Sequence, residues 1–260
     1  MSGELSGRIA VVTGASAGIG RAIAEDFVAR GAAVVINARR EPVLHEVAGA
    51  INDRAGREAA VCVPGDASAA KTVHAMLDRA ADHFGAEADL VVVNAGRGLA
   101  GSLMSSDEAQ WEEMISTNLI GAARLMRESG RRMVAAAADE TWPGKPRDIV
   151  VIGSTVGRHI SPFSSMYGST KFAVGSLAEA QRRELGPKGV RVTLIEPAIV
   201  RSEFQAVAGY DPGSFGDLMD KFSPVLEPED VARAIAFACS QPAGVHLSDI
   251  LIRGTRQDYP

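Results

Sequence analysis

The sequence predicts an α/β protein with one doubly wound parallel sheet, helices on both faces, and a single domain that spans residues 1–260. Three observations lead to this prediction. Short apolar runs alternate with longer segments of helical spacing along the chain. The runs are apolar throughout, as expected for parallel strands covered on both faces. No break in composition suggests a second domain, so all the runs are expected to join one sheet.

Seven short runs rich in β-branched residues are the predicted strands. In order, they are Ile9–Val12, Val34–Ile36, Val61–Val63, Leu90–Val93, Ile149–Ile152, Val192–Ile195 and Ile250–Ile252. Six segments between them have helical spacing: Gly18–Arg30, Pro42–Arg54, Ser68–Phe84, Ser106–Ala137, Ser164–Leu185 and Pro228–Cys239. Ser105 and Glu108 resemble a capping box for the fourth of these helices, and Pro228 suits a first helical turn.

Two segments interrupt the alternation of strands and helices. Asp139–Arg147 contains Pro143, Gly144 and Pro146, and is expected to be an exposed loop. Glu203–Pro224 is longer and rich in aromatic residues. Loops of that length in a compact domain are often lids or binding segments, so residues 203–224 are the predicted substrate loop.

Composition limits the classes of partner. The chain has 260 residues, a formal net charge of -5 and an isoelectric point of about 5.6. Nucleic acid and anionic membranes both attract basic surfaces, so neither is an expected partner. No apolar run is long enough to cross a membrane, and Met1–Gly7 lacks a signal-peptide pattern, which together favour a cytoplasmic protein.

The cysteines and histidines do not suggest a metal site. Cys62 and Cys239 lie in apolar surroundings and are expected to be buried free thiols rather than a disulfide or metal ligands. The five histidines are spread along the chain without the spacing of a ligand cluster. The sequence therefore predicts no bound metal.

A glycine-rich turn follows the first predicted strand and opens the first predicted helix. Its candidate cofactor-binding residues are Gly14, Ser16, Ala17, Gly18, Ile19 and Gly20. Glycines let the backbone approach a pyrophosphate closely, and a helix N-terminus offers free N–H groups. A glycine-rich connection can also bind nothing, but the strand before it and the helix after it favour a dinucleotide site.

The end of the second predicted strand indicates which nicotinamide nucleotide is preferred. The strand continues into Asn37, Ala38, Arg39 and Arg40, with no acidic residue where one would bind the ribose of NAD. A guanidinium matches phosphate geometry, so NADP(H) is expected to be preferred over NAD(H). Arg39 is the main candidate, and Asn37 and Arg40 are weaker ones. The alternative is that both arginines simply cap the strand end at the surface.

Two further strand ends should reach the same edge of the sheet. Asp66 and Ala67 follow the third predicted strand, where Asp66 would contact the adenine or, alternatively, would start the next helix with Ser68. Asn94, Ala95 and Gly96 follow the fourth predicted strand. Asparagine and glycine can lie against a cofactor with little steric cost.

A tyrosine and a lysine four residues apart form a candidate proton-transfer pair. Tyr167 and Lys171 should project from one helix face, and Ser154 ends the preceding predicted strand. A phenol ionises near pH ~10, and a fixed cation lowers that pKa. Tyrosine and lysine at this spacing are usually surface neighbours, so the pair gains weight only from the dinucleotide turn.

From Ser6 to Ile252 the chain resembles the short-chain dehydrogenase/reductase family. The ordered residues that carry the resemblance are Thr13, Gly14, Gly18, Gly20, Asn94, Ala95, Gly96, Asn118, Ser154, Tyr167 and Lys171. The resemblance implies a seven-stranded parallel Rossmann sheet, a nicotinamide cofactor and interconversion of carbonyl and alcohol. It also implies a homotetramer or homodimer formed through the long fourth and fifth helices.

The resemblance also implies a role for each catalytic candidate. Tyr167 would be the general acid or base, and Ser154 would hydrogen-bond the reacting oxygen. Lys171 would bind the nicotinamide ribose and lower the pKa of the phenol. Asn118 would hold a water that links Lys171 to solvent. Pro197 and Val200 would border the nicotinamide.

The chain departs from the family pattern at a few positions. Val93 precedes Asn94, where the family often has a second asparagine, and Ala198 and Ser202 stand where it usually has glycine and threonine. Ala17 stands where some NADP-preferring relatives have a basic residue. These departures concern local loop geometry, and they leave the NADP prediction resting mostly on Arg39.

The sequence leaves the substrate and some alternatives open. Arg158 and His159 suggest, weakly, a substrate with an acidic group. The favoured function is an NADP(H)-dependent oxidoreductase that acts on a small carbonyl compound, aldehyde or ketone, and its alcohol. An NAD(H)-dependent alcohol dehydrogenase, an enzyme of epimerisation or dehydration, and a non-catalytic dinucleotide-binding regulator are the alternatives. The early end after the last strand argues against an enzyme of epimerisation or dehydration. The presence of Ser154, Tyr167 and Lys171 together argues against a non-catalytic regulator.

Overall fold

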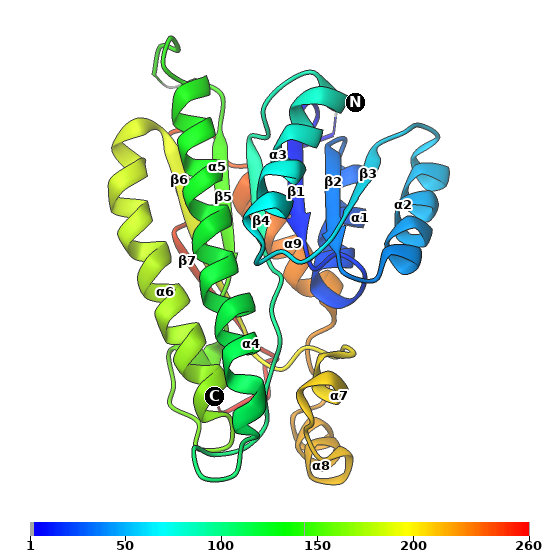
Figure 1. Cartoon of the computed structure of the whole chain (residues 1–260), viewed down its shortest axis with the longest axis vertical. Helices are drawn as coiled ribbons and strands as arrows, with labels where there is room; N and C mark the ends of the chain where they lie inside the picture. Colours follow the sequence, from blue (N-terminus) through cyan, green and yellow to red (C-terminus); the bar gives the residue numbers. More distant parts are fainter. Residues whose placement is uncertain (1–2, 143, 260) are drawn as a thin grey trace.

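A computed structural model describes residues 3–142 and 144–259, so predictions that concern Met1 and Pro143 lie outside the described residues. The centre is a seven-stranded sheet of order β3-β2-β1-β4-β5-β6-β7 in which every pairing is parallel (Figure 1). The strands are β1 (Ile9–Thr13), β2 (Ala33–Ala38), β3 (Ala60–Pro64), β4 (Leu90–Val93), β5 (Arg147–Ile152), β6 (Val190–Pro197) and β7 (Asp249–Ile252). All the predicted strands are present, and the predicted fold class is confirmed.

Helices cover both faces of the sheet. One face packs against α1 (Gly18–Ala29), α2 (Glu41–Ala55) and α9 (Pro228–Cys239), whose side chains share one hydrophobic core. The other face packs against α3 (Ala70–Phe84), α5 (Ala122–Ala136) and α6 (Ser165–Leu185), whose side chains share a second core.

The strands are apolar throughout because both of their faces are buried. Val11 belongs to the core beneath α3, α5 and α6, whereas its neighbour Val12 belongs to the core beneath α1, α2 and α9. Both side chains are 0% exposed. Successive residues of a strand point to opposite faces, so a sheet covered twice needs apolar residues at consecutive positions.

The predicted helix over Ser106–Ala137 is interrupted. It consists of the 3-10 turn η1 (Glu108–Gln110), α4 (Trp111–Ile115), the π-helical turn η2 (Ser116–Gly121) and α5. The predicted capping box of Ser105 is wrong, because the side chain of Asp107 is the cap and accepts a hydrogen bond from the Ala109 N–H at 3.1 Å. The Ser105 hydroxyl instead accepts from the Ser102 N–H at 3.0 Å.

The predicted loop over Glu203–Pro224 is also wrong in form, since it folds into α7 (Phe204–Ala208) and α8 (Pro212–Phe222). Asp211 caps α8 by accepting from the Ser214 N–H at 2.9 Å, and Pro212 occupies the first helical position. In Figure 1 both helices lie below the edge of the sheet where the strands end. They are therefore placed to cover anything bound at that edge.

Other local predictions are confirmed. Pro228 lies in the first turn of α9, where Glu227 and Asp230 form a reciprocal capping box. Cys62 and Cys239 are free thiols and Cys239 is buried, as predicted, whereas Cys62 is only partly buried.

A cluster of buried charges ties strands together at the amino-terminal edge of the sheet. Arg8 lies 2.7 Å from Asp89 and 2.8 Å from Asp148, and Arg191 lies 2.7 Å from Asp148. All four side chains are less than a tenth exposed. The opposite, carboxyl edge is where the strand order reverses, between β1 and β4. In a doubly wound sheet, ligands bind in the crevice at that point.

Candidate active site

The turn after β1 is folded tightly by glycines and one asparagine. Gly14 has a φ of +67°, and a Cβ there would lie 2.8 Å from the Asn94 side-chain nitrogen. Asn94 follows β4, and its Nδ2 donates to the carbonyl of Thr13 at 2.8 Å. The Thr13 hydroxyl accepts from the Asn94 and Ala95 N–H groups at 3.0 Å each. Asn94 and Ala95 thus hold the turn in shape.

The start of α1 is open and suits an anionic ligand. Gly18 has a φ of +53° and is the first residue of α1. Ala17 occupies the cap position, and no side chain caps the helix there. A Cβ on Gly20 would lie 2.4 Å from the Gly14 carbonyl oxygen, so only glycine fits this close approach. An uncapped helix N-terminus behind a tight glycine turn fits the pyrophosphate of a dinucleotide.

Ser154, Tyr167 and Lys171 come together at the end of β5. Ser154 follows that strand, and Tyr167 and Lys171 lie one turn apart in α6 with exposed fractions of 8% and 7%. The Lys171 Nζ donates to the Ile152 carbonyl at 2.7 Å. The Ser154 side chain is close enough to Tyr167 to lower the pKa of its phenol. The Ser154 hydroxyl additionally accepts from the Val156 N–H at 3.4 Å, which is the capping role that its position at a strand end suggests.

Burial controls the ionisation of both groups on α6. Burial raises the pKa of Tyr167 above its ordinary value, although the nearby Ser154 side chain acts in the opposite direction. Burial also lowers the pKa of Lys171 to about 8. Loss of water disfavours the charged form of each group. In the protein alone, burial dominates the pKa of the phenol, and the expected lowering by Lys171 stays a prediction. The Lys171 Nζ lies 5.8 Å from the centre of the Tyr167 ring and points to Ile152.

Asn118 lies within the π-helical turn η2 and is 2% exposed. Its Oδ1 accepts from the Arg97 N–H at 2.8 Å, and its Nδ2 donates to the Arg97 carbonyl at 2.9 Å. The Nδ2 also donates to the Thr170 hydroxyl at 3.1 Å. Both ends of the amide are thus held by protein partners, which fixes the chain after β4 against α6. The expected water link stays a prediction.

A cavity of about 750 Å³ connects the glycine turn to the end of β5. The predicted site residues that line it are Gly14, Ala17, Gly18, Ile19, Arg40, Asn94, Gly96, Ser154, Tyr167, Lys171, Pro197 and Val200. The predicted site residues that lie outside its lining are Ser16, Gly20, Asn37, Arg39, Asp66, Ala67, Ala95 and Asn118. Residues outside the lining can still support it. Ala95 helps to hold the glycine turn, and Asn118 fixes the chain after β4.

The arginines after β2 already have carboxylate partners. The Arg39 Nη1 lies 3.0 Å from Glu113, and the Arg40 Nη2 lies 3.2 Å from Glu203, all at exposed positions. The Arg40 Nη2 also lies 3.4 Å from the Ser16 hydroxyl. Only Arg40 is thereby placed beside the glycine turn, because the partner of Arg39 lies in α4.

Asn37 and Asp66 both form hydrogen bonds with neighbouring groups. Asn37 is 1% exposed, and its Nδ2 donates to the carbonyls of Val63 at 2.8 Å and Gly65 at 3.1 Å, which joins the ends of β2 and β3. Asp66 accepts from the Ser68 N–H and hydroxyl at 2.8 Å each. This is the alternative in which Asp66 organises the chain before the next helix.

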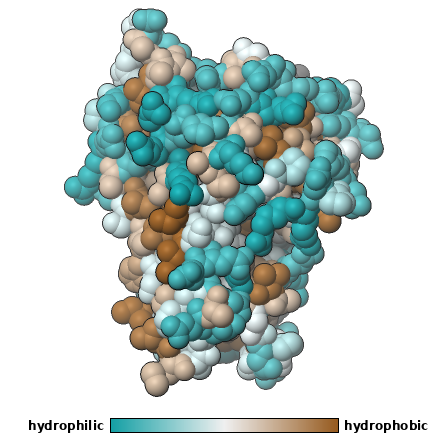
Figure 2. Space-filling model, viewed as in Figure 1, coloured by the Kyte–Doolittle hydropathy of each residue, from teal (hydrophilic) through white to brown (hydrophobic). Residues whose placement is uncertain are grey.

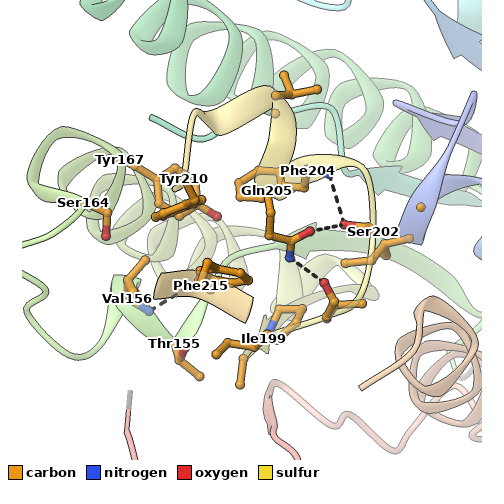
Figure 3. Close-up of a pocket in the computed structure, with 18 of the residues that line it drawn as sticks. Thr155, Val156, Ser164, Tyr167, Ile199, Ser202, Phe204, Gln205, Tyr210 and Phe215 are labelled. Atoms are coloured by element: carbon orange, nitrogen blue, oxygen red, sulfur yellow. Dashed lines mark hydrogen bonds between the residues drawn. The ribbon is translucent and has the colours of Figure 1, made fainter. Parts of the chain in front are cut away.

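The α7–α8 segment, which is the predicted substrate loop, supplies aromatic residues that line the cavity. Phe204, Tyr210 and Phe215 line the cavity, and Figure 3 shows them around it with Tyr167. The Gln205 Nε2 donates to the Val200 carbonyl at 2.7 Å, which anchors α7 to the chain after β6. Two signals could have identified these helices. They are the Asp-Pro pair at 211–212 and the apolar spacing of Phe215, Leu218 and Phe222.

Arg158 and His159 do not line the cavity. The Arg158 guanidinium pairs with Glu196 and, at 2.7 Å, with Asp249. Its charge is therefore paired with carboxylates of β6 and β7. The weak expectation that Arg158 binds an acidic substrate group is wrong.

Comparison with known proteins decides the family. The family described as short chain dehydrogenase matches residues 8–211 of this chain. The chain belongs to the short-chain dehydrogenase family. It is accordingly an oxidoreductase that uses a nicotinamide cofactor, and the resemblance drawn from its motifs is confirmed.

Relatives of this dehydrogenase match it over nearly its whole length. An uncharacterized oxidoreductase of Staphylococcus epidermidis is 30% identical over 246 residues, which cover 95% of this chain and 96% of that one. A 3-ketoacyl-(acyl-carrier-protein) reductase from Brucella melitensis, complexed with NADH, has a TM-score of 0.85 at 28% identity and covers 97% and 99% of the two chains. L-Sorbose reductase from Gluconobacter frateurii, complexed with NADPH and L-sorbose, has a TM-score of 0.83 at 27% identity with both chains fully covered.

The part of the dehydrogenase that the structure describes has neither a membrane-spanning helix nor a metal-holding cluster. Among residues 3–142 and 144–259, no helix is long and apolar enough to span a bilayer. Within the same described residues, no group of three or more histidine, cysteine or acidic side chains is arranged to hold a metal ion.

Proposed function

We propose that this dehydrogenase is an NADP(H)-dependent oxidoreductase that interconverts a carbonyl compound and its alcohol, with Tyr167 as general acid and base. The observation that carries the proposal is the meeting of Ser154, Tyr167 and Lys171 in the cavity that also contains the glycine turn. A pure nucleotide binder has no need for a buried phenol and a serine hydroxyl lining the same cavity at that place.

The protein's own residues would divide the work in the following way. The glycine turn and the open start of α1 would hold the dinucleotide, whose nicotinamide ring supplies or accepts the hydride when bound. Ser154 would hold the reacting oxygen beside the phenol. Tyr167 would donate its proton to that oxygen in reduction and accept one in oxidation. General acid–base catalysis of this kind contributes about 10²–10⁴-fold.

Burial suits Tyr167 to the donor role. Its raised pKa keeps the phenol protonated at neutral pH, so a proton is available for reduction. Lys171 has a pKa of about 8 and exchanges its proton readily near neutrality. Since both ends of the Asn118 amide bond to the Arg97 backbone, we propose that it acts as a positioning residue for Arg97 and α6. Any water in a proton relay would then be held by backbone groups of the π-helical turn, which lack ordinary α-helical partners.

The proposed preference for NADP(H) rests on Arg39 and Arg40 at the end of β2 and on the absence of an acidic residue there. One observation favours the alternative of NAD(H). Both guanidinium groups already pair with carboxylates, Glu113 and Glu203, so a 2′-phosphate would have to compete for them. Titration of the protein with NADPH and NADH, followed by cofactor fluorescence, tests the preference. A tighter dissociation constant for NADH would refute it.

Three coarser features complete the proposal. The whole chain, residues 1–260, would act as one cofactor-binding domain with residues 203–224 as its substrate segment. It would assemble as a homotetramer or homodimer through the helices that include α5 and α6. Its two free thiols fit a reducing compartment, so we place it in the cytoplasm.

The test of the catalytic assignment is Tyr167→Phe, which removes only the hydroxyl. Turnover should fall at least 100-fold, as expected for loss of the general acid, while cofactor binding is retained. Ser169→Ala is the matched control, since it removes an exposed hydroxyl from the same helix outside the cavity. Full activity of Tyr167→Phe with the preferred cofactor would refute the proposal.

A further inference from the structure

We propose that the substrate carries a bulky apolar group, such as an aromatic ring or an alkyl chain, next to its carbonyl. The proposal rests on the function proposed above for the same cavity and specifies its substrate class. The structure assigns Phe204, Tyr210 and Phe215 as the residues that select this group.

The α7–α8 segment presents an aromatic wall to the reacting end of the cavity. The ring of Phe204 lies 5.5 Å from the ring of Tyr167, and the rings of Tyr210 and Phe215 lie 5.1 Å apart. All four rings line the one cavity, as Figure 3 shows. Ring pairs at these separations form a continuous apolar surface that favours contact with another apolar group.

The lower part of this wall follows from the sequence of α8. Phe215, Leu218 and Phe222 lie three and four residues apart and therefore share one face of the helix. All three line the cavity. Asp217 is exposed on α8 and does not line the cavity. Ser214 and Lys221 of the same helix also line the cavity, so α8 contributes a central apolar stripe with polar residues beside it.

The cations of the described lining do not offer a free charge for an acidic substrate. Arg40 pairs with Glu203, Arg97 pairs with Glu113, and Lys221 lies 3.7 Å from Asp258. Lys171, the remaining described cation in that lining, is turned to the Ile152 carbonyl. Asp211 also lines the cavity, has no ion pair among the described residues, and would repel a carboxylate. An acidic group on the substrate is therefore disfavoured where an apolar one is accommodated.

The rim of the cavity is apolar as well. Phe163 and Val207 line the cavity and are 73% and 62% exposed, and Ile160, on the same connection as Phe163, is 83% exposed. Figure 2 shows hydrophobic surface at the lower end of the molecule, where α4 and α6 begin in Figure 1. Exposed apolar patches of this kind commonly border ligand-binding grooves. An apolar substrate would meet a matching surface before it enters.

Benzylacetone and levulinate test the inference, since both are methyl ketones and differ in a phenyl group against a carboxylate. With the preferred cofactor, kcat/KM for benzylacetone should exceed that for levulinate at least tenfold. Equal or better use of levulinate would overturn the inference while leaving the proposed function intact. If neither ketone is reduced, the proposed function fails for these carbonyls. Ligand-observed NMR of the cofactor-loaded protein then decides the inference by comparing the binding of the two.

Variants of α8 locate the selecting surface. Phe215→Ala should raise the KM for benzylacetone about tenfold and change kcat little, and Phe215→Arg should shift the preference toward levulinate. Asp217→Ala is the matched control on the same helix and should change neither constant. Phe215 is only partly buried, so both replacements are expected to fold, which circular dichroism would confirm. Unchanged KM values in Phe215→Ala and an unchanged preference in Phe215→Arg would overturn the assignment.

Discussion

The ammonium of Lys171 donates a hydrogen bond to the backbone carbonyl of Ile152, with 2.7 Å between the two atoms. Ile152 is the last residue of β5, two positions before Ser154, and Lys171 lies one turn after Tyr167 in α6. This bond therefore ties the strand that ends beside Ser154 to the helix that carries Tyr167. It also places an amine in a site that burial makes unfavourable for its charged form.

The burial of Lys171 predicts a pH dependence of stability. An unfolded lysine titrates near ~10.4, whereas the pKa of Lys171 in the fold is about 8. Between these values the unfolded chain binds more protons, so the stability contributed by this group rises with pH from about 8 to about 10.4. Compared with Lys171→Met, the unmodified protein should gain on the order of 2 kcal/mol in unfolding free energy between pH 7.5 and 10.

Urea denaturation of both proteins at several pH values measures this difference. Groups other than Lys171 titrate alike in both and cancel. A difference in unfolding free energy that stays constant across the range would show that the lysine keeps an ordinary pKa.

Gly20 should tolerate no side chain. A Cβ there would meet the Gly14 carbonyl at 2.4 Å, and backbone cannot move aside without opening the turn. Gly20→Ala should lower the melting temperature and abolish cofactor binding. Gly49→Ala is the control, because Gly49 lies inside α2 with nothing within 4 Å of the added Cβ. It should stabilise the protein by about 0.5–1 kcal/mol. Normal cofactor affinity in Gly20→Ala would contradict the structure of the turn.

Glu113 should compete with a 2′-phosphate for Arg39. The two side chains lie 3.0 Å apart and both are at least half exposed, so the pair is weak. Glu113→Gln should therefore tighten NADPH binding by a factor of up to about five, and change NADH binding less. Fluorescence titration with both nucleotides measures the effect. Weaker NADPH binding in this variant would mean that Glu113 orients Arg39 and does not oppose the phosphate.

The buried charge cluster at the other edge of the sheet should dominate stability without affecting the chemistry. The Asp148 carboxylate lies 2.8 Å from Arg8 and 2.7 Å from Arg191, and Asp148→Asn would remove its charge from both pairs. The expected cost is about 3–5 kcal/mol of unfolding free energy. Glu179→Gln, which breaks exposed ion pairs on α6, should cause no comparable loss. Equal melting temperatures of the two variants would contradict this ranking.

Most of the fold could be predicted because a parallel sheet with helices on both faces needs strands that are apolar throughout, and such strands are visible as apolar runs in the sequence. The runs at Val11–Val12 and Val34–Ile36 are buried on both faces, so their limits are clear in the sequence. The two helices between 203 and 224 were not predicted because aromatic and polar residues alternate there around Gly209. The break in the fourth helix was not predicted either, since a π-helical turn has no distinct residue signal.

The candidate site could be predicted where backbone geometry demands particular residues. Gly14, Gly18 and Gly20 are required by the turn, and helical spacing brings Tyr167 to Lys171. Properties that depend on three-dimensional surroundings could not be predicted. The pKa of Tyr167 follows from its burial, and the orientation of Arg158 follows from the distant Glu196 and Asp249.

The π-helical turn at Ser116–Gly121 constrains how this chain can tolerate change in length. Such a turn accommodates one more residue than an α-helical turn does. Deleting one residue from this turn would restore ordinary α-helical winding, so Leu125 and Met133 would keep their places against the sheet. A deletion within the regular α5 would instead rotate every later residue of that helix by about 100°. The π-helical turn is therefore the part of this long helix where the loss of one residue disturbs packing least, provided that Asn118 and its contacts with Arg97 remain.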